Sequence, residues 1–112
     1  MPDKRMKVTV FRDADHKTSG FQVSGHSEYN PGHEDILCAA VSALATNCVN
    51  SIEAFTDDEP LYLAVNEEEG FMHFKLKTVS DKSGLLLDSF VLGIKSLEAS
   101  YGKFIQIQYE EE

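Results

Sequence analysis

Apolar and polar residues alternate near the start of the chain in the pattern of a β-hairpin. Over residues 6–13, Met6, Val8 and Val10 alternate with other residues, and the alternation returns at Phe21 and Val23 after a polar stretch that contains Gly20. Alternation with a period of two places successive side chains on opposite faces of a strand. The first part of the chain is therefore predicted to form two antiparallel strands joined by a turn.

A helical pattern follows over about residues 35–55, after a loop over residues 25–34. Asp35 is a good candidate for the N-cap of this helix, because its carboxylate can accept a hydrogen bond from the backbone N–H of the third helical residue. Asp57 and Pro60 mark its end. The apolar residues that recur at steps of three or four are Leu37, Val41, Leu44, Cys48, Ile52 and Phe55. Such a stripe is typical of a helix that packs on a core with one face.

The second half of the chain repeats the order strand, strand, helix and then adds a strand. Alternating apolar residues predict strands over residues 61–65, 72–76 and 105–109, and helical spacing predicts a helix over about 84–100. Gly102 lies where a glycine commonly follows the last helical turn. The predicted order is ββαββαβ. Because the hairpins imply antiparallel pairing, the predicted fold class is α+β, with one mostly antiparallel sheet and two helices packed on it.

Composition and charge narrow the functional classes. The 112 residues predict a single domain over 1–112. The net charge of −9 argues against direct nucleic-acid binding through phosphates and favours a basic partner. Two cysteines are too few for a disulfide framework, no apolar run approaches the roughly 20 residues of a membrane span, and no secretion signal is visible. We therefore expect a cytoplasmic enzyme or binding module without a membrane partner.

The candidate chemistry lies around the start of the first helix. Asp35, Cys38 and Ser42 are spaced i, i+3, i+7 and share one helix face. A cysteine in a first helical turn is expected to have a lowered pKa, because the helix dipole and free N–H groups stabilise the thiolate. His26, at the end of the second strand, can lie beside it. A thiolate next to an imidazole is the requirement for cysteine nucleophilic catalysis, and first-turn N–H groups, including that of Cys38, can form an oxyanion hole.

Two other interpretations of these residues stay open, one without any chemistry and one with a metal ion. Cys38 can be a small buried cysteine and His26 a loop histidine without chemistry. Alternatively, His26, His33 and Cys38 supply three possible metal ligands, although their spacing matches no strong zinc pattern. Cys48 lies on the apolar stripe and is predicted to be a core cysteine.

The same residues carry a family resemblance. The segment Gly25-His26-Ser27, the helix opening Asp35-Ile36-Leu37-Cys38-Ala39-Ala40-Val41-Ser42 and the order ββαββαβ resemble the ribosomal-processing cysteine protease Prp family. The resemblance implies a homodimeric cysteine endopeptidase that needs no cofactor or metal. It also implies the substrate: the precursor of a large-subunit ribosomal protein, which loses its N-terminal extension after a phenylalanine in a short hydrophobic segment.

The resemblance also assigns roles to individual residues. The family nucleophile matches Cys38 and its base matches His26, while Asp35 and Ser42 match supporting positions. The chain departs from the family pattern at His33, which stands where the family has a glycine two residues before the aspartate; Gly32 lies one position earlier.

A substrate loop follows from these residues. Gly25 and Gly32 bracket a loop in which Tyr29 can cover an apolar slot when no substrate is bound.

The alternative function is a non-catalytic acidic binding module that acts in ribosome assembly, and a small metal-binding protein is the third hypothesis. Fast alkylation of Cys38 near neutral pH would favour the protease, and metal content would identify the third.

Overall fold

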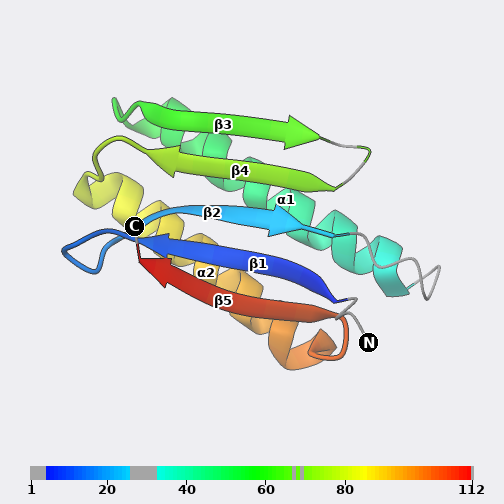
Figure 1. Cartoon of the computed structure of the whole chain (residues 1–112). Coiled ribbons are helices and arrows are strands. Elements are labelled where there is room, and N and C mark those ends of the chain that lie inside the picture. Colours follow the sequence, from blue (N-terminus) through cyan, green and yellow to red (C-terminus); the bar gives the residue numbers. More distant parts are fainter. Residues whose placement is uncertain (1–4, 26–32, 67, 69, 112) are drawn as a thin grey trace.

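The computed structural model describes residues 5–25, 33–66, 68 and 70–111. Its elements follow the predicted order (Figure 1). They are β1 (Met6–Arg12), β2 (Thr18–Ser24), α1 (His33–Phe55), β3 (Pro60–Asn66), β4 (Phe71–Leu76), α2 (Asp81–Tyr101) and β5 (Ile105–Glu111). The prediction of an α+β fold with five strands and two helices is confirmed.

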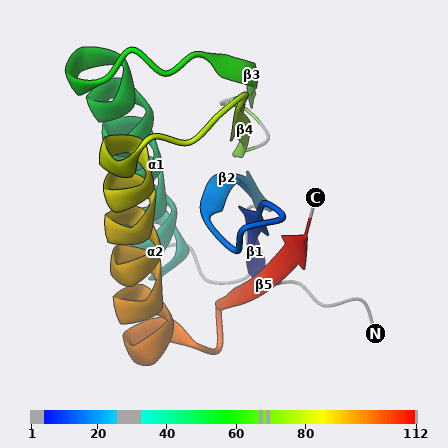
Figure 2. The same cartoon turned by 90° about the vertical axis from the view of Figure 1, so that its left-hand side faces the viewer.

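The five strands form one sheet in the order β3-β4-β2-β1-β5. β1 pairs with β5 in parallel, and the other three pairings are antiparallel, so the sheet is mostly antiparallel as predicted. Both helices lie side by side on one face of the sheet (Figure 2). This two-layer arrangement buries the inner face of the sheet against the apolar stripes of the helices.

The core lies between the sheet and the two helices. Phe21 of β2 stacks on Phe90 of α2 with a centroid distance of 4.2 Å, and Val41 of α1 is fully buried in the same cluster. Each large apolar side chain buried in this way contributes about 2 kcal/mol. The predicted stripe of α1 is confirmed except at its end, because Phe55 is 67% exposed.

Both helices begin earlier than predicted. α1 begins at His33, so Asp35 is its third residue and the prediction that Asp35 caps the helix is wrong. α2 begins at Asp81 because Ser80 is its N-cap and accepts a hydrogen bond from the backbone N–H of Ser83. Gly102 directly follows the last residue of α2, as predicted, and its φ of −59° is in the right-handed region.

β2 also begins earlier than predicted and includes Gly20. A Cβ atom on Gly20 would lie 2.1 Å from the carbonyl oxygen of Phe74, so only glycine allows β2 to approach β4 this closely. The turn between β1 and β2 lies instead at residues 13–17. There the Asp13 carboxylate accepts hydrogen bonds from the backbone N–H groups of Asp15 and Lys17.

β3 is the edge strand, and its apolar residues are not covered. Leu61, Leu63 and Val65 are 54%, 47% and 51% exposed. The register shifts between Pro60 and Tyr62, so the predicted alternation is broken at its first apolar residue. Beyond this irregularity, Leu63 lies opposite Phe74, a core residue, and therefore faces the layer of the helices. The helices leave an apolar surface open on this strand.

The expectation that no apolar run approaches a membrane span is wrong for α1. Its residues Ile36–Phe55 are long and apolar enough to cross a membrane, with a mean hydropathy of 1.4. The helix is nevertheless amphipathic: Leu37 and Ile52 are buried in the core, whereas Ser42 and Glu53 are exposed. Length and composition are shared by membrane spans and by core helices of globular domains.

Candidate active site

Cys38 lies near the start of α1, at the margin of the core. It is partly buried and packs against the core cluster while retaining exposed surface. Ser42 lies one helical turn further along and is exposed. Because residues four apart are neighbours on a helix surface, Cys38 and Ser42 share a face, as predicted. The site therefore combines a thiol and a hydroxyl at the boundary between core and solvent.

The position of Cys38 within α1 differs from the prediction in a way that affects its chemistry. Because α1 begins at His33, Cys38 is its sixth residue and not its third. Only the first four N–H groups of a helix lack an intrahelical acceptor, and the dipole effect falls off within the first turn. The prediction that the Cys38 N–H is free to form an oxyanion hole is therefore wrong. The start of the helix therefore contributes little to the stabilisation of a Cys38 thiolate.

Cys48 has a contrasting environment on the same helix. Its side chain is buried in the core, and its thiol donates a hydrogen bond of 3.7 Å to the carbonyl oxygen of Leu86. Burial raises the pKa of the Cys48 thiol to about 12, because the thiolate would lose its solvation. The prediction of a core cysteine is confirmed. Neither cysteine forms a disulfide bond with the other.

Several predicted site residues lie outside the described residues: His26, Tyr29 and Gly32. The roles of His26 as base, of Tyr29 as cover of an apolar slot and of Gly32 as hinge therefore stay predictions. Gly25 is described, and its φ of +99° is a conformation that favours glycine at the end of β2. Among the side chains that the structure describes, no group of three histidine, cysteine or acidic residues is placed to hold a metal ion.

An apolar cavity of about 290 Å³ opens one helical turn from Cys38. α1 contributes Ser42 and Ala45 to its wall, and the β3–β4 hairpin contributes Val65 and Met72. Among the predicted site residues that the structure describes, Ser42 lines it. The sequence led us to expect an apolar slot near Cys38 but did not indicate that the β3–β4 hairpin would line it.

A second cavity of about 360 Å³ lies further along the same two elements. Its floor is formed by Ile52 of α1 with Leu63 and Phe74 of the sheet, and Glu53 and Asp57 lie at its rim. Both cavities arise because the inner face of β3 is left partly uncovered. The two cavities share no described lining residue and follow one another along α1. We call them together, from Ser42 to Asp57, the α1–β3 groove.

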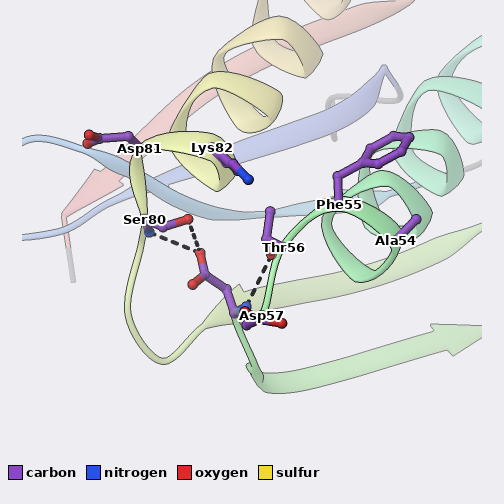
Figure 3. A pocket seen from close by; sticks show the side chains of 8 residues that line it. Ala54, Phe55, Thr56, Asp57, Ser80, Asp81 and Lys82 are labelled. Carbon is purple, nitrogen blue, oxygen red and sulfur yellow. Dashed lines mark hydrogen bonds between the residues drawn. The ribbon is translucent and has the colours of Figure 1, made fainter.

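A polar recess of about 460 Å³ lies between the end of α1 and the start of α2 (Figure 3). The Asp58 carboxylate accepts hydrogen bonds of 2.6 Å from the Ser80 hydroxyl and 2.9 Å from the Ser80 N–H. These bonds, with a further contribution from Ser83, lower the pKa of Asp58 below its usual value. Since Ser80 caps α2, the network joins the α1–β3 connection to the start of α2, which indicates a structural role.

Comparison with known proteins places this geometry in a family. The family model of cysteine protease Prp matches residues 6–106. The ribosomal processing cysteine protease Prp of Bacillus subtilis strain 168 is 26% identical over 101 residues, with 86% of this chain and 89% of that protein covered. Its counterpart from Staphylococcus aureus strain Mu50 is 26% identical over 97 residues and covers 84% and 89%.

Solved structures show the same fold. The crystal structure of the S. aureus protease Prp in complex with a substrate peptide has a TM-score of 0.85 at 23% identity, with 94% of this chain and 99% of that chain covered. A Streptococcus mutans protein of 28% identity has a TM-score of 0.82 and covers 96% and 99%. The family match over nearly the whole chain, with the shared fold, leads to one conclusion: this chain belongs to the cysteine protease Prp family.

Proposed function

We propose that this protein is a cysteine endopeptidase that removes the N-terminal extension of a large-subunit ribosomal protein, with Cys38 as nucleophile and His26 as base. The observation that carries the proposal is the contrast between the two thiols. Cys38 retains exposed surface and lies one turn from an apolar cavity, whereas Cys48 is buried with a raised pKa. Membership of the Prp family supports the protease activity, and the names of the relatives support a ribosomal substrate.

The mechanism follows from the chemistry of a thiolate and an imidazole. The Cys38 thiolate attacks the scissile carbonyl carbon, and the imidazolium of His26 donates its proton to the leaving amine. Water, deprotonated by His26, then hydrolyses the thioester and releases the second product. Because the Cys38 N–H belongs to the helical hydrogen-bond pattern, the donors that stabilise the oxyanion are other groups. Asp35 and Ser42, on the same helix face, are proposed to support the pair.

The acidic surface suits this substrate. A net charge of −9 attracts a basic precursor and raises the rate of encounter at low ionic strength. The enzyme would act in the cytoplasm as a homodimer. The experiment that tests the proposal is incubation with the precursor ribosomal protein, followed by mass spectrometry of the products. A single cut that releases the N-terminal extension supports it, and an intact precursor after prolonged incubation contradicts it.

A further inference from the structure

We propose that the α1–β3 groove binds the hydrophobic segment of the substrate in an extended conformation and recognises two apolar side chains about four residues apart, with a positive charge near the end remote from Cys38. The inference rests on the proposed function for its occupant. It goes beyond that function by assigning substrate specificity to residues on β3 and on the second half of α1.

The apolar floor of the groove is the first argument. Leu63 and Val65 face the helix layer, since they pair with Phe74 and Met72, yet about half of each side chain remains exposed. Covering half of a leucine side chain is worth roughly a tenfold change in affinity. Exposed apolar side chains beside two cavities, the nearer of which lies one helical turn from the candidate nucleophile, fit a segment that is itself apolar.

The spacing of the two cavities is the second argument. On α1 the first cavity is centred near residue 44 and the second near residue 52, and eight residues of helix span about 12 Å. An extended peptide covers this distance in about four residues at roughly 3.3 Å each. Because side chains of an extended chain alternate, those at positions i and i+4 point to the same side. One extended segment can therefore fill both cavities.

The charge of the rim is the third argument. Glu53, Asp57 and Asp58 line the cavity remote from Cys38, whereas the described side chains that line the cavity near Ser42 carry no charge. A lysine, an arginine or a free N-terminus of the substrate would find its counter-charge at the remote end. This polarity also orients the segment, because only one direction brings both the positive charge and the scissile bond to their sites.

The test compares two exposed leucines by the same substitution. Leu63→Asn should lower kcat/KM for an extended hydrophobic peptide about tenfold, mainly through KM. Leu92→Asn, on the outer surface of α2 where Leu92 is 66% exposed, should leave it unchanged. Replacing the remote apolar residue of the peptide with serine should produce a similar loss, and the two changes together should be less than additive. Equal kcat/KM for Leu63→Asn and Leu92→Asn would overturn the inference.

Two substitutions that each remove one negative charge test the end of the groove remote from Cys38. Glu53→Gln should weaken binding of a peptide that carries lysine beyond the remote apolar residue and should reduce the dependence of binding on salt, because the rim charge attracts the lysine. Glu110→Gln, on the opposite edge strand, is the matched control. Binding that is the same in both variants would contradict the predicted orientation.

A binding assay on Cys38→Ala separates the groove from the catalytic proposal. A labelled peptide that binds this variant in a Leu63-dependent manner supports the groove even if the wild type cleaves nothing, which would contradict the protease proposal alone. Cleavage without dependence on Leu63 would contradict the groove alone. A peptide that is neither bound nor cleaved would contradict both.

Discussion

Alkylation of the native protein should modify Cys38 and spare Cys48. The perturbation is iodoacetamide at pH 7.5, where a thiol with a pKa of about 12 is ionised to only about 3 parts in 100,000 and an ordinary cysteine to about one tenth. The difference in thiolate content is therefore about 3,000-fold. A thiolate of higher pKa is intrinsically more nucleophilic, by roughly half a decade per pKa unit, which reduces the difference to about 50-fold.

Access increases this difference further. Cys48 is 4% exposed, so the reagent reaches it only when the structure opens, and an opening that costs about 5 kcal/mol populates roughly one molecule in 5,000. By either route Cys48 should react at least about 50-fold more slowly than Cys38.

The assay is a time course followed by peptide mass spectrometry, with labelling in denaturant as the control, where both cysteines should react at similar rates. Labelling of the native protein at two rates within about tenfold of each other would refute the assignment of a reactive and a structural thiol.

Four further predictions concern the active pair and the fold. If His26 acts on the Cys38 thiolate, kcat/KM should follow a bell-shaped pH profile near neutrality; a single rise near pH 8.5 would contradict the pairing. Ser80→Ala should lower the free energy of unfolding by about 1 kcal/mol through loss of the α2 cap. The pKa of Asp58 is lowered in the folded state, so its stabilising effect should be present above its ordinary pKa near 3.9 and be lost as the pH falls through the folded-state value. The free energies of unfolding of Asp58→Asn and wild type, measured in urea, should therefore converge in acid. Gly20→Ala should cost about 1–3 kcal/mol in thermal or urea unfolding, whereas Gly84→Ala, whose Cβ would meet only Val79 at 3.6 Å, should be neutral or stabilising.

The order of elements and most of the core could be predicted from the sequence. Periodicity reports which side chains are buried, and the α1 stripe from Leu37 to Ile52 is an example. The start of α1 could not be predicted as well, because an aspartate is favourable both as N-cap and within the first turn. Asp35 marks the beginning of a helix without specifying its own position in it.

The sequence led us to expect an apolar slot near Cys38, but the part of β3 in the groove could not be predicted. Alternating apolar residues look the same whether or not a helix covers the strand, so the pattern at Leu63 and Val65 predicted burial. Their exposure follows from the position of β3 at the sheet edge, which is a property of the tertiary arrangement. Gly20 presents a similar case, because its close approach to Phe74 depends on the pairing of β2 with β4.

Mass spectrometry of the precursor ribosomal protein after incubation with wild type and with Cys38→Ala tests the central claim most directly. Since alanine is well tolerated in a helix, the variant should keep the fold, which circular dichroism can verify. The account predicts one cut by the wild type that removes the N-terminal extension and a loss of at least about 1,000-fold in the variant, the scale seen when a nucleophile is removed. Turnover by Cys38→Ala within about tenfold of wild type would contradict the assignment of Cys38 as the nucleophile.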